Sequence, residues 1–479
     1  MVERKLAVAF GAMMWALALP ATATELREAV ETALTTNPEV LAAAQNREAT
    51  EFELRQAKGL YLPTLDLEMS AGSRRLDSPG RRRLGIENDE LDSADVGLTL
   101  SQTLFDGGSR RAALERQAAR VDGASYRVGE RSEALALAVT QEYFEILLQA
   151  EIVAIAKKNA AALSQIVSDI SEGASGGTLT VVDRTQGRER LLSAKARLKE
   201  AEEDLEQAKI RFARLVGVAP ASMKAMRQPP SVSSVVPGTV DNAMEIARRQ
   251  SPAIAAARAD IDAAEAMVRG AQSSYLPKVA LEATARVGSN IDGSEGRTHD
   301  LEAKVVARWN LYRGGRDQAA EQEAIRRASQ SRQDNALVYR EVRESILSAW
   351  NKRARRAEQA SILREQVSVA NELVASYRDQ FRIGERSLLD VLSAQNTWFN
   401  TQVLAKTAQY AAVYADYQIL AAMGSLVGSF KLKAGAQSEA YARKEFDVRT
   451  NEREPAYKKL PSQQQNDLPL DLLAPVRSP

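Results

Sequence analysis

Residues 301–315 read LEAKVVARWNLYRGG, and this stretch combines two patterns that decide the fold. Apolar side chains recur at every second position from residue 301 to 311. A period of two places one face of a β-strand in an apolar environment and the other in water. The stretch closes on Gly314 and Gly315, and glycine tolerates backbone conformations that a sharp bend requires. It therefore predicts a strand that bends into a helix.

Three further segments alternate in the same way, at residues 279–287, 65–69 and 96–100. The four predicted strands approach the roughly 9 to 11 residues that cross a membrane when tilted. Polar loops at residues 76–91 and 290–300 join them in pairs, which is typical of the outer side of a membrane barrel. A half-buried sheet of a soluble protein would also alternate.

Four strands cannot close on themselves as a barrel. An open sheet edge in lipid leaves backbone groups unpaired at a cost of several kcal/mol each, so a membrane sheet requires association of copies. Three copies would supply twelve strands, an even number that suits such barrels. The strand pattern thus predicts assembly.

The chain contains an internal two-fold sequence repeat. Tyr61-Leu62-Pro63 recurs 214 residues later as Tyr275-Leu276-Pro277 (277 − 63). The bend motif at residues 311–315 has a counterpart at residues 104–108, which contains Gly107 and Gly108, at a spacing of 207 (314 − 107). Residues 177–183 fall on residues 384–390 at the same spacing. Pro63 and Pro277 mark helix ends, because proline disfavours helix in the residue before it.

The repeat sets the expected boundaries. Repeat 1 covers residues 24–216, with a β-hairpin at about 64–105 and long helices at 109–172 and 183–216. A proline-rich linker covers residues 217–238. Repeat 2 covers residues 239–430, with a hairpin at about 278–312 and long helices at 315–381 and 390–428. Residues 431–479 are polar and predict a disordered tail.

Residues 1–23 have the features of a signal peptide. Arg4 and Lys5 precede an apolar run at residues 6–19, and Ala21-Thr22-Ala23 resembles a cleavage site. The alternative is a short membrane anchor, but the run is shorter than the ~20 residues that span a bilayer. The chain contains no cysteine, which excludes disulfides, thiol catalysis, cysteine-based zinc sites and lipid attachment through cysteine.

Long helices account for most of the rest. Proline is absent between Pro79 and Pro220 and between Pro277 and Pro455. A helix over residues 109–172 would be roughly 95 Å long. Heptad-like stripes, typical of coiled coils, run through Val139, Tyr143, Ile146, Ala150 and Val153, and through Leu392, Asn396, Phe399, Val403, Lys406, Tyr410, Val413, Tyr417 and Leu420. Such stripes alone favour a scaffold rod, but a rod would not carry membrane-type hairpins.

Composition argues against nucleic-acid binding and catalysis. The 64 Lys and Arg nearly balance the 63 Asp and Glu, so there is no basic footprint for a polyanion. With a single histidine, the sequence offers no activated nucleophile, phosphate loop, cofactor motif or metal cluster. We therefore expect no enzyme activity and no cofactor.

The export signal, duplicated hairpins, glycine pairs and long helices together resemble the TolC family of outer-membrane factors over residues 26–430. The resemblance implies an α+β membrane protein: a homotrimeric twelve-stranded β-barrel in outer-membrane lipid, continued by a coiled-coil periplasmic tunnel. It implies the exit duct of a tripartite efflux pump or type I secretion system. Such a duct exports drugs, toxic compounds or proteins with a periplasmic adaptor and an inner-membrane RND or ABC transporter. The alternative is a periplasmic coiled-coil scaffold or adaptor.

The resemblance also implies a gate where the helical hairpins turn, at residues 173–183 and 381–390. Asp390 matches the pore constriction, where three carboxylates would favour cations and could hold a divalent ion. Ser393 stands where a second acid is found in the family. Arg386 and Asp183 match a closing ion pair, and Phe381 replaces a tyrosine that donates a hydrogen bond.

These residues also have a purely structural interpretation. Asp183 and Asp390 both precede predicted helices, where aspartate is a favoured N-cap worth ~1 kcal/mol. Gly177 and Gly384 could serve only to end the preceding helix. Spacing alone favours capping, and the family resemblance favours gating at Asp390.

Overall fold

The computed structural model describes residues 25–175, 179–218, 226–291 and 295–449. The predicted signal peptide at residues 1–23 lies outside these residues. The chain forms two compact units. The helical unit comprises residues up to 43, 128–251 and 342–436, and the sheet unit comprises residues 44–127, 252–341 and from 437 onward.

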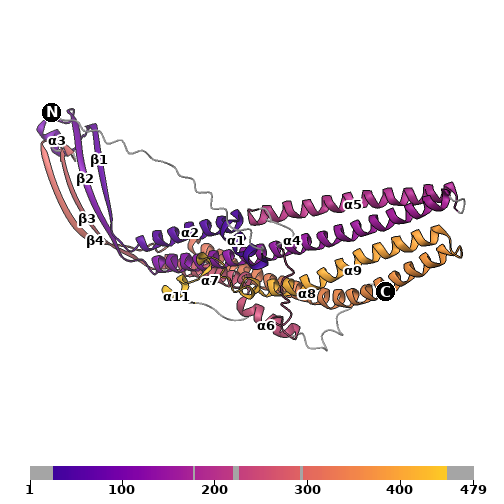
Figure 1. Ribbon diagram of the computed structural model, residues 1–479. Coiled ribbons are helices and arrows are strands. Elements are labelled where there is room, and N and C mark those ends of the chain that lie inside the picture. Colours follow the sequence, from indigo (N-terminus) through magenta and orange to yellow (C-terminus); the bar gives the residue numbers. More distant parts are fainter. Residues whose placement is uncertain (1–24, 176–178, 219–225, 292–294, 450–479) are drawn as a thin grey trace, which may run out of the picture. The chain divides into compact units, whose positions relative to one another are not determined.

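One antiparallel sheet dominates the sheet unit. Its strands are β1 (Thr64–Arg75), β2 (Glu90–Phe105), β3 (Lys278–Ser289) and β4 (Arg297–Arg308), and they pair in the order β1-β2-β3-β4 (Figure 1). The short helix α3 (Pro79–Leu84), capped by the Ser78 side chain, lies in the loop of the first hairpin. The four strands per chain that the sequence predicts are confirmed. β1 and β4 are the two edges of this sheet.

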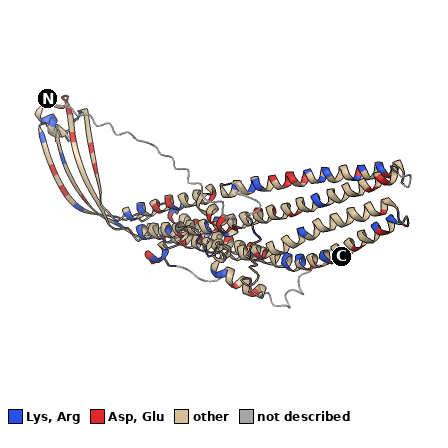
Figure 2. Ribbon diagram, viewed as in Figure 1, with Lys and Arg blue, Asp and Glu red and all other residues tan. Residues whose placement is uncertain are grey.

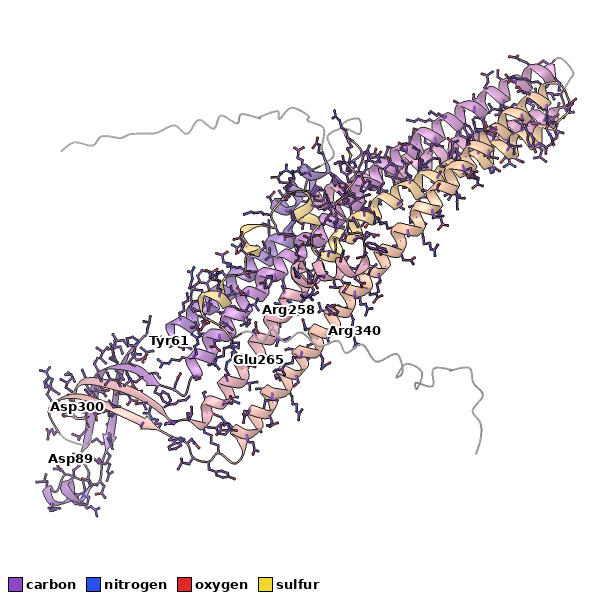
Figure 3. The ribbon with its side chains drawn as sticks, turned by 90° about the horizontal axis from the view of Figure 1, so that it is seen from below. Tyr61, Asp89, Arg258, Glu265, Asp300 and Arg340 are labelled. Atoms are coloured by element: carbon purple, nitrogen blue, oxygen red, sulfur yellow. The ribbon has the colours of Figure 1, made fainter. Side chains whose placement is uncertain are left out.

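The register sorts the side chains onto two faces. Leu67 pairs with Leu98, Leu98 with Ala285, and Ala285 with Leu301, so one row is wholly apolar. The neighbouring row carries Glu68, Gly97, Arg286 and Asp300; Figure 3 labels Asp300 on β4. The apolar side chains are not covered within the chain: Leu301 is 84% exposed. A contiguous exposed apolar face of this kind marks a surface that contacts lipid or another protein.

Glycine pairs form the bends that follow β2 and β4. Gly107 and Gly108 have φ of 67° and 92°, in the left-handed region that favours glycine. A Cβ on Gly107 would lie 2.7 Å from the Cβ of Leu276. Gly314 and Gly315 have φ of 63° and 80° in the same role. Pro63 immediately precedes β1, and Pro277 lies between the 3₁₀ turn η2 (Ser273–Tyr275) and β3.

The chain after residue 436 forms a strap in the sheet unit, where the sequence predicts disorder from residue 431. The strap contains the end of η4 (Ala436–Ser438) and all of α11 (Ala442–Glu445). The carboxylate of Asp122 accepts the N–H groups of Tyr441, Ala442 and Arg443 at 2.9, 2.8 and 3.1 Å. The Arg443 guanidinium donates to both Asp122 and Asp262. Residues 437–449 are thus ordered by buried charge, which a composition argument does not detect.

The helices are long. α4 (Ser109–Ser175) and α8 (Arg316–Arg382) each have 67 residues, which corresponds to roughly 100 Å. α5 (Val181–Val216) and α9 (Leu388–Met423) follow them, each with 36 residues. The shorter helices are α1 (Leu26–Thr36), α2 (Pro38–Gly59), α6 (Val240–Gln250), α7 (Pro252–Gln272) and α10 (Leu426–Ser429). Within the described residues, none of the helices is both long enough and apolar enough to cross a membrane.

Aromatic side chains fill the core of the helical unit. Tyr143 and Tyr417 are 0% and 1% exposed, and Phe212 is fully buried beside Tyr143. The Tyr143 hydroxyl donates to the carbonyl of Arg227, and the Tyr417 hydroxyl donates to that of Pro230. The described part of the predicted linker is therefore packed against this core. Figure 2 shows basic and acidic residues interspersed along the helices, in keeping with the balanced composition.

Candidate functional site

The two helical turns that the sequence singles out are capped alike. Thr180 caps α5: its Oγ1 accepts the N–H of Asp183 at 3.2 Å, and Asp183 Oδ2 accepts the N–H of Thr180 at 2.9 Å. Ser387 caps α9: its Oγ accepts the N–H of Asp390 at 3.3 Å and donates to Asp390 Oδ2 at 2.8 Å. The two caps lie 207 residues apart (387 − 180), the spacing of the repeat.

Both acids therefore occupy the third helical position. The prediction that Asp183 and Asp390 are N-caps is wrong in detail. In each helix the N-cap is a hydroxyl residue, and the aspartate three residues later accepts a hydrogen bond from it. Hydrogen bonds from the side chain and backbone of Thr180 hold the pKa of Asp183 below its usual range. Asp183 is thus ionised at neutral pH, and the negative charge also suits the positive end of the helix dipole.

Arg386 makes local contacts within its own chain. Its Nε donates to Gln380 Oε1 at 3.0 Å, and its guanidinium lies over the ring of Tyr377, 4.4 Å from the ring centroid. Among the described residues of one chain, Arg386 and Asp183 form no ion pair. A pair between neighbouring copies stays a prediction.

An apolar cluster holds the two turns together. Phe381, which lacks the hydroxyl of a tyrosine, packs against this cluster. Gly187 on α5 lies so close to α4 that a Cβ there would be 2.9 Å from Ile170 Cδ1. Ser393 is exposed on α9. The buried members of the cluster are Leu163, Ile166, Ile170, Ala194, Leu388, Val391 and Leu392.

Sequence reasoning missed Gln395, which is 1% exposed near this cluster. The predicted heptad stripe of α9 includes Asn396, and this position is exposed. The sequence feature that could have identified Gln395 as a core residue is its spacing. Leu388, Leu392, Gln395 and Phe399 follow one another at intervals of four, three and four residues. A polar residue in the series was not recognised as a core residue.

A buried carboxylate fixes the corner between α9 and α10. Glu133 on α4 accepts the N–H groups of Leu426 at 2.9 Å and of Val427 at 3.2 Å. Burial raises the pKa of Glu133 to about 7, against the lowering effect of these two hydrogen bonds.

This shift predicts a pH-dependent stability. The folded state holds the Glu133 proton up to about pH 7, and the unfolded state releases it near its ordinary pKa of 4.5. The folding stability that Glu133 contributes therefore falls as pH rises from about 4.5 to 7. Relative to wild type, Glu133→Gln should gain thermal stability between pH 5 and pH 8, measured by melting curves at several pH values. A pH-independent difference would exclude Glu133 as the titrating group.

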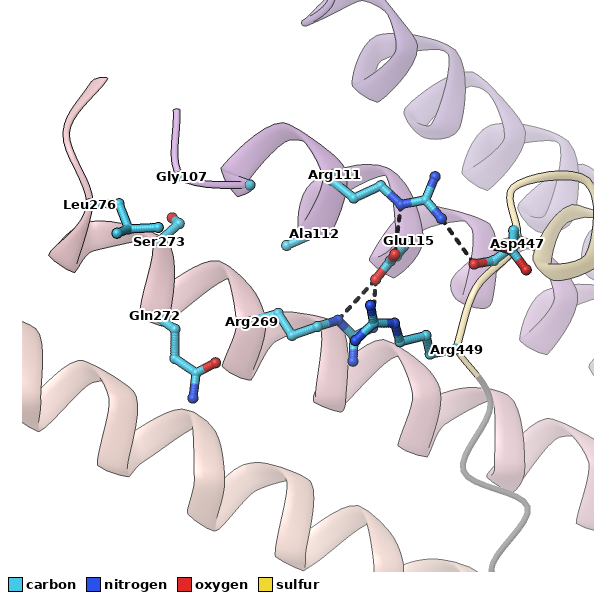
Figure 4. Close-up of a pocket in the computed structure, with 11 residues that line it drawn as sticks. Gly107, Arg111, Ala112, Glu115, Arg269, Gln272, Ser273, Leu276, Asp447 and Arg449 are labelled. Atoms are coloured by element: carbon cyan, nitrogen blue, oxygen red, sulfur yellow. Dashed lines mark hydrogen bonds and ion pairs between the residues drawn. The ribbon is translucent and has the colours of Figure 1, made fainter. Parts of the chain in front are cut away.

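The sheet unit contains a polar cavity of about 410 Å³ beside the first glycine bend (Figure 4). Glu115, 4% exposed, lies in it between two arginines. Arg111 donates to its Oε1 at 2.7 Å, and Arg269 donates to its Oε2 at 2.6 Å. Arg111 also donates to the carbonyl groups of Phe446 and Asp447 in the strap. The charges thus join α4, α7 and the strap.

Comparison with known proteins identifies the family of this fold. The profile of the family described as "Outer membrane efflux protein" matches residues 29–218 and 243–425. The outer membrane efflux protein BepC of Brucella suis is 25% identical over 332 residues, 69% of this chain and 72% of BepC. The outer membrane protein TolC of Escherichia coli is 22% identical over 417 residues, 84% of this chain and 83% of TolC.

A solved structure has the same fold. The outer membrane protein VceC of Vibrio cholerae aligns with a TM-score of 0.71 and 18% identity over 83% of this chain and 96% of VceC. The resemblance to the TolC family that the sequence indicates is confirmed. The chain belongs to the outer membrane efflux protein family, and it is an outer-membrane exit duct of an efflux or secretion system.

Proposed function

We propose that three copies of this chain form one continuous duct, with a twelve-stranded barrel in the outer membrane and a helical tunnel in the periplasm. The observation that carries this proposal is the four-stranded sheet, whose edges β1 and β4 are unpaired within the chain and whose apolar face is uncovered. Joining β1 of one copy to β4 of the next removes every open edge. A sheet in lipid needs this closure, because backbone groups at an open edge would have no hydrogen-bond partner. The apolar face then contacts lipid, and the polar face lines the lumen.

The duct works with a periplasmic adaptor and an inner-membrane transporter of the RND or ABC type. The family description supports this proposal, because efflux against a concentration gradient requires an energy source that a passive channel does not provide. The sequence contains no motif for nucleotide binding or catalysis, so in this proposal the transporter supplies the energy for export. Drugs, toxic compounds or proteins are the cargo classes that fit such a duct.

The trimer can be tested by cysteine crosslinking, because the chain has no native cysteine. We expect Asp66→Cys on β1, combined with single cysteines scanned along β4, to give disulfide-linked dimers and trimers at the positions that face each other. Denaturing electrophoresis without reductant would measure the products. The same scan placed on β2 is the control and should give none. A ladder that continues beyond three copies, or monomer alone, would contradict the closed ring.

The gate lies at the turn before α9, with Asp390 at the constriction. Three Asp390 carboxylates around a pore favour cations, so Asp390→Ala should lower the cation preference. Arg386→Ala should raise the conductance, because it removes the cation that we place in the closing contact with Asp183 of a neighbouring copy. Both quantities follow from single-channel recordings under a salt gradient. Unchanged values for both variants would remove these residues from the gate.

A further inference from the structure

A chain of three polar side chains, two of them buried, ties three helices together beside the candidate gate. Arg378 on α8 donates from Nη2 to Gln395 Oε1 on α9 at 2.7 Å. Gln395 in turn donates from Nε2 to Asn159 Oδ1 on α4 at 2.9 Å. Gln395 is 1% exposed and Asn159 is 8% exposed, so water does not compete for this second bond.

Gln395 and Asn159 occupy positions that apolar residues fill elsewhere in the same interface. The buried residues of α9 in this region include Leu388, Leu392, Gln395 and Phe399. Those of α4 include Ala156, Asn159, Leu163 and Ile166. Both series step by three and four residues, the spacing of coiled-coil core positions. The polar pair therefore interrupts an apolar seam, with one apolar cluster on each side of it.

Burying such a polar pair lowers the folding stability, but it fixes how the two helices pack against each other. Burying an amide costs free energy unless its hydrogen bonds are made. Apolar contacts are non-directional, so two helices joined by them alone can slide and bury the same area again. A slide of one residue moves α9 by ~1.5 Å along α4, enough to spoil a 2.9 Å hydrogen bond. Polar residues at core positions are known to fix the register of coiled coils in this way.

We propose that Arg378, Gln395 and Asn159 form a register lock that positions the gate. Asp390 precedes Gln395 by five residues on α9 (395 − 390), which is roughly 7.5 Å along the helix. Fixing Gln395 against α4 therefore fixes the height of Asp390 in the pore. Opening of the gate breaks the bond between Gln395 and Asn159 and lets α9 shift. This inference rests on the proposed constriction at Asp390, and the three residues act on it as positioning residues.

The test uses a variant in which both amides are removed together. In Asn159→Leu/Gln395→Leu the seam becomes continuously apolar, and the partly buried Arg378 can turn to solvent. Because no buried amide is left unsatisfied, the assembled protein should melt at or above the wild-type temperature. Its open-to-closed ratio in single-channel recordings should nevertheless rise roughly tenfold, the effect expected when hydrogen bonds that favour one state are lost.

Two single variants serve as controls. Gln395→Glu can still accept from Arg378 and from a turned Asn159 amide, so its recordings should match wild type. Thr397→Leu changes an exposed residue two positions further along α9 and should also match wild type. Wild-type gating in the double variant, or a change in Gln395→Glu as large as in the double variant, would overturn the lock. An unchanged cation preference in Asp390→Ala would instead overturn the gate assignment itself, so the two failures are distinguishable.

Discussion

Replacing Asp122 with alanine is expected to release the strap that follows residue 436. The Asp122 carboxylate is 4% exposed and accepts three backbone N–H groups as well as the Arg443 guanidinium. Its loss leaves those N–H groups without their acceptor and Arg443 with Asp262 as its remaining carboxylate partner. Removing one partner of a buried pair costs about 3 to 5 kcal/mol. We therefore expect a clearly lower melting temperature and new proteolytic cleavage between residues 437 and 449.

The matched control is Asp260→Ala in the same unit. Asp260 pairs with Arg127 at 2.5 Å, but the two side chains are 43% and 47% exposed. Exposed ion pairs contribute about 0 to 1 kcal/mol, so this variant should melt close to wild type. Equal effects of the two substitutions would show that the strap is not held by its buried charges.

The second large effect is expected from a charge on the apolar face of the sheet. Leu98 lies in the central apolar row of β2, in register with Leu67 and Ala285. Leu98→Arg would place a guanidinium in the hydrocarbon region, which costs roughly 2 to 4 kcal/mol per chain near the bilayer midplane. We expect the variant to lose most of its assembled form in the outer membrane, measured by membrane fractionation and electrophoresis without heating.

Thr99→Arg is the control for Leu98→Arg, because Thr99 is the next residue of β2 and its side chain lies on the opposite face of the sheet. Thr99 is in register with Asp66 and Thr284, on the polar face that we assign to the lumen. A charge there stays in water, so assembly should be retained. If Thr99→Arg were as damaging as Leu98→Arg, the assignment of lipid and lumen faces would be wrong.

Periodic patterns in the sequence were sufficient to predict the sheet and the long helices. The alternation at residues 301–311 and the glycine pairs act locally, because a strand face and a positive φ are properties of neighbouring residues. The strap could not be predicted in this way. Its order depends on Asp122 and Asp262, which are far from Arg443 in the sequence and meet it only in the folded chain.

The region of the proposed gate was predicted less completely, for a similar reason. The repeat spacing located both turns, yet the hydroxyl caps Thr180 and Ser387 were not recognised and the acids were assigned the wrong helical position. Gln395 was missed because a polar residue at a core position is identified by its partners, Arg378 and Asn159, which lie on two other helices. Which copy's residues meet across the pore is set by assembly.

Single-channel recording of the detergent-purified wild-type protein in a planar bilayer tests the central claim most directly. The account predicts discrete openings that prefer cations, because the proposed trimer is a closed duct with a ring of Asp390 carboxylates at its constriction. Purified, assembled protein that never produces such openings would contradict it.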